Sequence, residues 1–171
     1  GNLILAVGRN VDRGHDDVAL FEVGPQYLDP TPKGQAFVAA GVRRGRDARR
    51  HWAGPPREVD AYDAKADAQA VLEAIGAPTA SMQIAAEAPA WYHPGRSAVM
   101  RLGPKNVLAA FGEIHPRILD RMDVTGPMVG FEVFIENAPP PKAKASRNRD
   151  KLLVSDLPSV QRDFAFVVDQ D

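Results

Sequence analysis

The sequence predicts an α+β fold in which an antiparallel sheet is flanked by helices. Strand-like apolar runs follow one another through short turns, and there is no regular alternation of strand and helix, so hairpins should dominate the topology. One stripe of apolar residues at helical spacing supplies a covering helix. With 171 residues, 44% of them apolar, the chain is long enough to bury one ordinary core. We expect the helices on one side of the sheet.

The first part of the chain predicts a helix followed by two paired strands. Leu3, Ile4, Val7 and Val11 recur at helical spacing, and Gly14 ends the run. Residues 18–23 and 35–42 are strand-like, and the turn-rich segment 24–34 joins them. They should form an antiparallel pair.

The middle of the chain predicts one amphipathic helix. Its apolar positions are spaced by three or four residues and would face the core: Ala64, Ala68, Val71, Leu72 and Ile75. Asp60 or Asp63 serves as its amino-terminal cap, and Gly76 with Pro78 ends it.

A hairpin and a third strand complete the predicted sheet. Residues 97–102 alternate in polarity, and a four-residue turn at 103–106 leads into a second strand at 107–114. His115 caps a short helix that begins with Pro116, where a missing N–H costs nothing. Residues 128–135 form another strand.

The carboxyl-terminal part is predicted to be a linker followed by an isolated strand. Residues 138–157 begin with a proline cluster and are mostly polar. The apolar run 163–169 has no partner strand, and the first helical run begins without a cap. We therefore expect the chain to be cut at both ends, and the isolated chain to show either some non-native dimer contact through exposed apolar surface or disorder at its tail.

Composition excludes several function classes. A formal net charge of −1 and a pI near 6.5 argue against a dedicated nucleic-acid-binding module. The absence of cysteine excludes disulfides and thiolate metal sites and is compatible with the cytosol. No apolar run approaches the roughly 18 residues of a membrane span, and no familiar phosphate-loop or nucleophile-elbow motif occurs.

His93, Glu113 and His115 are candidate metal ligands or proton carriers, because imidazole and carboxylate are common in both roles. The spacing does not match a helical zinc site, since Glu113 and His115 lie two residues apart at a strand end. The favoured interpretation is structural: the histidines cap turns and bond to the backbone.

Two further segments carry candidate binding residues. Gly95 and Arg96 fit the start of an anion site, but a turn with Arg96 on the surface is the favoured interpretation. A basic segment fits an RNA contact, a subunit contact or a solvated loop. Its members are Arg43, Arg44, Arg46, Arg49, Arg50 and Trp52.

Seven short motifs follow one another along nearly the whole chain. They are Phe21-Glu22-Val23-Gly24, His51-Trp52, Tyr62-Asp63-Ala64-Lys65-Ala66-Asp67, His93-Pro94-Gly95-Arg96-Ser97-Ala98, Gly112-Glu113-Ile114-His115-Pro116, Phe131-Glu132-Val133 and Pro158-Ser159-Val160-Gln161-Arg162-Asp163. Each is weak alone, but together and in this order they resemble the bacterial phenylalanyl-tRNA synthetase beta subunit family. Ala66 stands where the family often has Gly, which only raises helix propensity.

The resemblance implies a catalytic-like module over residues 1–137, with the class II aminoacyl-tRNA synthetase fold but without its chemistry. It also implies that residues 158–171 are the first strand of a ferredoxin-like anticodon-binding domain. The expected role is non-catalytic support of the alpha subunit, in a cytoplasmic assembly of two alpha and two beta subunits that charges tRNA(Phe). ATP and magnesium would serve the whole enzyme, and the resemblance assigns no catalytic, cofactor-binding or metal residue to this chain. His93, Gly95, Gly112 and His115 would be structural.

Overall fold

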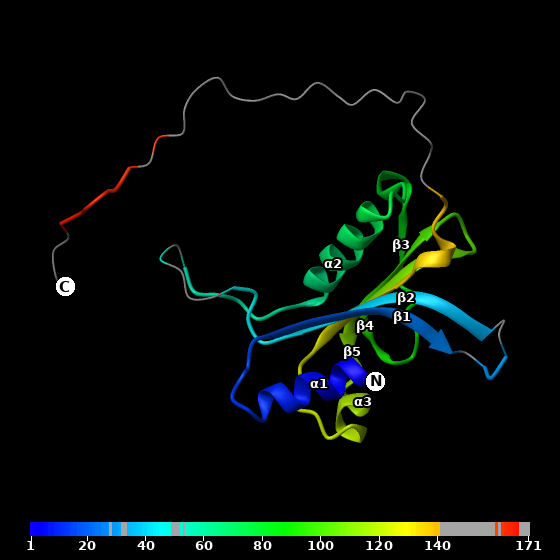
Figure 1. Ribbon diagram of the computed structural model, residues 1–171, viewed down its shortest axis with the longest axis horizontal. Helices are drawn as coiled ribbons and strands as arrows, with labels where there is room; N and C mark the ends of the chain where they lie inside the picture. The colour runs from blue at the N-terminus through cyan, green and yellow to red at the C-terminus, as the bar shows by residue number, and fades with distance from the viewer. Residues whose placement is uncertain are drawn as a thin grey trace.

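The computed structural model describes residues 1–27, 29–31, 34–48, 52, 54–140, 160 and 162–167. Helices and strands alternate irregularly along this part of the chain (Figure 1). In order they are α1 (Asn2–Val11), β1 (Val18–Tyr27), β2 (Gln35–Arg44), α2 (Ala61–Ala74), the short 3₁₀ helix η2 (Thr79–Ser81), β3 (Gln83–Ala85), β4 (Tyr92–Leu102), β5 (Asn106–Ile114), α3 (Pro116–Arg121), β6 (Val129–Phe134) and the 3₁₀ helix η3 (Ile135–Asn137).

The strands form one six-stranded sheet in the order β1-β2-β6-β5-β4-β3. Every neighbouring pair is antiparallel, which confirms the predicted α+β class with an antiparallel sheet. The predicted pairing of the first two strands is confirmed, with β1 and β2 each extending to ten residues. The predicted hairpin is also confirmed as β4 and β5.

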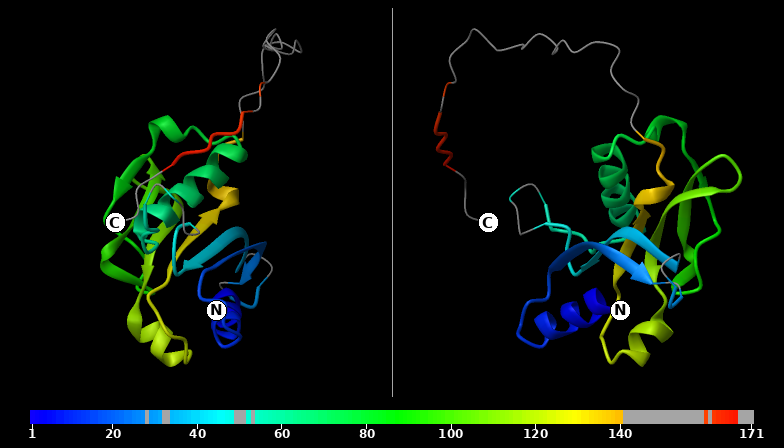
Figure 2. Two further views of the ribbon diagram at one scale, coloured as in Figure 1. Left: turned by 90° about the vertical axis from the view of Figure 1, so that its left-hand side faces the viewer. Right: turned by 45° about the vertical axis from the view of Figure 1, so that its right-hand side comes forward.

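Helices cover both faces of the sheet, so the expectation of helices on one side is wrong. Helix α2 lies on one face, whereas α1 and α3 lie on the other (Figures 1 and 2). Two apolar cores result: Leu72 of α2 packs in one, and Val7 of α1 and Leu119 of α3 pack in the other. The physical reason is visible in β5, where Leu108, Ala109, Ala110 and Phe111 are all buried. An unbroken apolar run of this kind indicates a strand covered on both faces.

The helix starts follow the predicted capping chemistry. Asp60 caps α2 by accepting from the Tyr62 N–H, and Asp63 accepts in return from the Asp60 N–H, which forms a capping box. His115 caps α3, and Pro116 occupies its first turn. Both predictions are confirmed.

The predicted linker at 138–157 lies outside the described residues except for 138–140. Within 158–171, residues 160 and 162–167 are described; they are exposed and belong to no strand. The division into residues 1–137, 138–157 and 158–171 stays a prediction.

The helices in the described ranges include none with the length and apolarity needed to cross a membrane.

Candidate functional site

His93 and His115 lie together where β4 begins and β5 ends. Their rings stack with centroids 6.4 Å apart. The Nδ1 atom of His93 accepts from the Gly95 N–H at 3.1 Å, and that of His115 accepts from the Arg117 N–H at 3.2 Å. Each imidazole therefore bonds to its own turn, as the structural interpretation requires.

Glu113 faces Arg96 across the hairpin and not the histidines. The Arg96 guanidinium donates from Nε and Nη2 to the two carboxylate oxygens, at 2.5 and 2.8 Å. This pairing raises the pKa of Arg96, mainly through the hydrogen bond. The two charged groups are thus engaged with each other, and no cluster of three metal-ligating side chains occurs in the part of the chain that the structure describes.

Gly112 is required by a close approach of β4. A Cβ at this position would lie 2.5 Å from the Arg96 carbonyl oxygen, and the backbone φ is +149°. The pairing of β4 with β5 shifts register between Tyr92 and Ser97 at the same place. The His93–Gly95 turn and Gly112 thus form one structural unit.

The basic segment is divided between a strand and a loop. Arg43 forms a bidentate ion pair with Asp67 of α2 at 2.6 and 2.7 Å, and Arg44 donates to the backbone carbonyls of Asp16 and Thr125. The Arg46 side chain has no hydrogen bond or ion pair to any other described residue. Trp52 is 92% exposed, and Arg49 and Arg50 lie outside the described residues.

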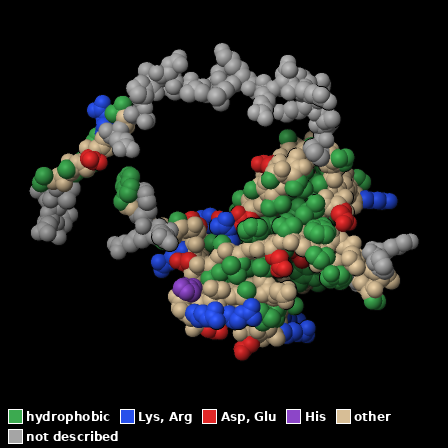
Figure 3. Space-filling view, in the orientation of Figure 1, with side chains coloured by type: hydrophobic (Ala, Val, Ile, Leu, Met, Phe, Trp, Pro, Cys, Tyr) green, Lys and Arg blue, Asp and Glu red, His purple; other side chains and the backbone are tan. Residues whose placement is uncertain are grey.

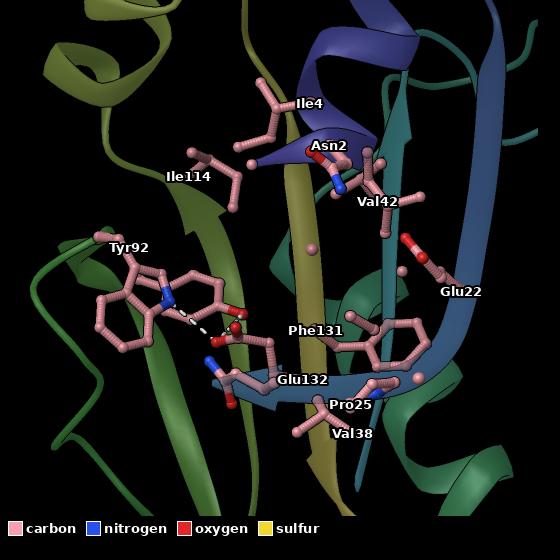
Figure 4. A pocket seen from close by; sticks show the side chains of 18 residues that line it. Asn2, Ile4, Glu22, Pro25, Val38, Val42, Tyr92, Ile114, Phe131 and Glu132 are labelled. Atoms are coloured by element: carbon pink, nitrogen blue, oxygen red, sulfur yellow. Dashed lines mark hydrogen bonds between the residues drawn. The ribbon is translucent and has the colours of Figure 1, made fainter. Parts of the chain in front are cut away.

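A pocket of about 390 Å³ opens between the first turn of α1 and the face of the sheet that α1 covers (Figure 4). Strands β1, β2 and β6 supply its floor, and Trp91 with Tyr92 closes one side. Two carboxylates, Glu22 and Glu132, line it. None of the described residues that line it is Lys, Arg or His.

Glu132 is held in place by the aromatic wall of this pocket. Its Oε2 atom accepts from the Trp91 Nε1–H at 2.8 Å and from the Tyr92 hydroxyl at 3.4 Å. Burial, followed by the nearby Glu132 charge, raises the pKa of Tyr92 well above its ordinary value. The Tyr92 hydroxyl therefore stays protonated and donates to the carboxylate.

Sequence reasoning missed these pocket residues as a site. Glu132 appeared only within a family motif, and Trp91 was not singled out. The available signal was an acidic residue in the middle of an apolar strand, Val129–Phe134, because such a residue needs a partner when it is covered.

An apolar strip lies on the opposite face of the sheet, along its β1 edge. Phe21, Val23 and Tyr27 of β1 are 78%, 54% and 66% exposed, and Phe37 of β2 is 51% exposed. The space-filling view shows hydrophobic side chains gathered over β1, β2 and α2 (Figure 3). Helix α2 packs mainly against β5 and β6, so it leaves this strip uncovered.

Comparisons with known proteins agree with one another. A family model described as the phenylalanyl tRNA synthetase beta chain CLM domain matches residues 1–135. The chain is 56% identical to the phenylalanine–tRNA ligase beta subunit of Rhodospirillum rubrum and 54% identical to that of Paramagnetospirillum magneticum, each over 168 residues. These matches cover 98% of this chain but 21% of each relative, so the chain spans about a fifth of their length.

Solved structures share the fold. A pyrrolysyl tRNA synthetase from Desulfitobacterium hafniense, PylSc, aligns with a TM-score of 0.55 and 18% identity over 80% of this chain and 44% of that chain. A second structure of pyrrolysyl-tRNA synthetase from the same organism aligns with a TM-score of 0.54.

Proposed function

Because the chain belongs to the family of the phenylalanyl tRNA synthetase beta chain CLM domain, we propose that it is a non-catalytic assembly module. It keeps a class II synthetase-like fold and supports an alpha subunit that carries the active site. The whole ligase charges tRNA(Phe) in the cytoplasm, with ATP and magnesium bound outside this chain.

The observation that carries the assembly role is the apolar strip formed by Phe21, Val23, Tyr27 and Phe37. Large exposed side chains of this kind, contiguous on one face, are typical of a protein–protein interface. The strip also lies on β1, an edge strand whose outer backbone groups are unpaired within the sheet. A partner subunit that covers the strip would bury its apolar side chains and could also pair with the backbone groups of the edge strand.

The charge of the pocket supports the non-catalytic part of the proposal. Glu22 and Glu132 line it, and no cationic side chain accompanies them in the described lining. A nucleoside triphosphate would meet two like charges there, and no Lys or Arg side chain of the described lining would offset its own charge. The sheet face beneath α1 is therefore poorly suited to hold ATP.

The assembly role predicts that polar substitution in the strip weakens binding to the alpha subunit. We expect the double variant Phe21→Ser, Val23→Ser to co-purify with the alpha subunit of the same organism far less than wild type does, because buried apolar contacts are lost. The matched control is Ile84→Ser, since Ile84 is 50% exposed on β3 at the other edge of the sheet.

Unfolding curves must show that the double variant folds. Undiminished association of that folded variant would contradict the interface, and formation of phenylalanyl-adenylate by this chain alone would contradict its non-catalytic character.

The alternative function is direct contact with tRNA through the basic segment. Two observations favour it: the Arg46 side chain has no ion pair among the described residues, and Trp52, six positions further along the chain, is 92% exposed. Arginine and tryptophan together can pair with phosphate and stack on a base. Arg43 contributes less to this function, because its charge is already matched by Asp67.

A further inference from the structure

The pocket beneath α1 has the size, shape and charge of a small-molecule site. Its volume of about 390 Å³ lies within the range of ligand pockets. Its walls combine apolar side chains such as Ile4 and Val38 with a few polar groups, and Figure 4 shows Glu22 and Glu132 both pointing into it. We infer that it binds a small organic cation, a primary alkyl- or arylalkylammonium without a carboxylate, whose ammonium group is held by Glu132.

The strand register explains why there is room between the two carboxylates. Glu22 pairs with Ala40, and Ala40 pairs with Glu132, so the three residues form one row on one face of the sheet. Neighbouring strands lie about 4.8 Å apart, which places the Cα atoms of the two glutamates at roughly 10 Å. Ala40 fills little of the space between them.

Glu132 is ready to accept an ammonium group. Trp91 and Tyr92 hold its Oε2 atom, and the other oxygen has no hydrogen bond from a described residue. A carboxylate fixed in this way loses little further freedom when it binds a donor. Neither Glu132 nor Glu22 has an ion-pair partner within the described ranges, so both carboxylates are available to a cationic group.

The aromatic wall favours an organic cation over a hydrated metal ion. Trp91 is 43% exposed at the pocket wall and offers an indole ring to an ammonium or to an apolar body. Only two carboxylates face the space, and two are too few ligands for a hard cation such as Ca²⁺.

The charges of Glu22 and Glu132 also disfavour an amino acid as the ligand. The carboxylate of a zwitterion would enter a pocket that offers it no cationic side chain among the described lining residues. The inference thus concerns amines and goes beyond the assembly role; its test measures binding, which does not depend on the alpha subunit.

Three probes with the same phenyl ring test the ligand class by isothermal titration calorimetry on the intact protein that carries this sequence. They are 2-phenylethylamine, the uncharged 2-phenylethanol, and phenylalanine, which adds a carboxylate to the amine. We expect the amine to bind at least about tenfold more tightly than either of the others. No heat from the amine up to about 10 mM, or equal binding of phenylalanine, would overturn the inference.

Two variants locate the site. Glu132→Gln keeps the shape of the side chain and removes its charge, and we expect it to weaken amine binding by about tenfold or more. Glu22→Gln changes an exposed residue and should weaken binding by a smaller factor. The control is Glu73→Gln on α2, which covers the other face of the sheet and should leave the affinity unchanged. If the amine binds both pocket variants as it binds wild type, the site lies elsewhere.

Discussion

At Gly112, strand β5 lies so near the backbone of β4 that there is no room for a side chain. A methyl group there would lie 2.4 Å from the Ser97 Cβ and 2.5 Å from the Arg96 carbonyl oxygen. The oxygen is a backbone atom and the Cβ is bonded directly to the backbone, so no side-chain rotation can move either atom aside.

Gly112→Ala should therefore lower the free energy of unfolding by about 2 kcal/mol or more, through steric overlap and an unfavourable φ. Urea denaturation followed by circular dichroism measures the change. The control is Gly24→Ala, because a Cβ at Gly24 meets no atom within 4 Å. Equal midpoints for the two variants would contradict the argument.

At the residue scale, local chemistry was predictable and distant pairing was not. The backbone-bonding roles of His93 and His115 follow from the turn and cap residues beside them. The pairing of Arg43 with Asp67 joins β2 to α2, and that of Trp91 with Glu132 spans 41 residues. Such contacts depend on strand order, which a single sequence does not specify.

The start of α2 is the element whose stability depends most clearly on charge. Arg57 donates to both oxygens of Asp63 at 2.8 and 2.7 Å, and Asp63 also accepts from the Asp60 N–H. These contacts, led by the Arg57 hydrogen bond, lower the pKa of Asp63 from its ordinary value. In the unfolded chain the group titrates near an ordinary value of about 3.9.

A depressed folded-state pKa stabilises the protein above the unfolded pKa, and this stabilisation is lost as the pH falls through the folded pKa. We therefore expect wild type to lose more stability between about pH 5 and pH 3 than Asp63→Asn does. Urea midpoints across this range measure the difference. Asp12→Asn, at an exposed side chain without an ion pair among the described residues, should follow wild type. Parallel curves for wild type and Asp63→Asn would refute the expected linkage.

The sequence predicted which strands and helices occur more reliably than it predicted where they begin and end. The predicted strand 97–102 begins at Tyr92 in the structure, because the register shift between Tyr92 and Ser97 interrupts the period-two alternation. Strand β3 has three residues, too few for a periodic signal. The helix at 64–75 was recognised because its stripe continues for three turns.

At the scale of the whole molecule, the sheet separates two surfaces of different character. The α2 side carries the apolar strip at the β1 edge, and the α1 side carries the acidic pocket. The sequence predicted the antiparallel sheet but not this division, because the continuous apolar run in β5 was read only as one strand and not as a strand covered twice. The assembly proposal and the amine proposal rest on opposite faces and can fail separately.

None of the described residues of the basic segment belongs to the apolar strip or lines the acidic pocket, so its role is tested separately. If the segment does not pair with phosphate, Arg46→Ala should leave the slope of log K against log salt unchanged when the assembled ligase binds tRNA(Phe). If Arg46 does pair with a phosphate, the slope should flatten by about one unit.

The double variant Arg49→Ala, Arg50→Ala extends the test along the segment. The control is Arg96→Ala, because Glu113 already neutralises that guanidinium. A flattened slope in the basic-segment variants, with the control unchanged, would assign the segment to tRNA and make the alternative function correct.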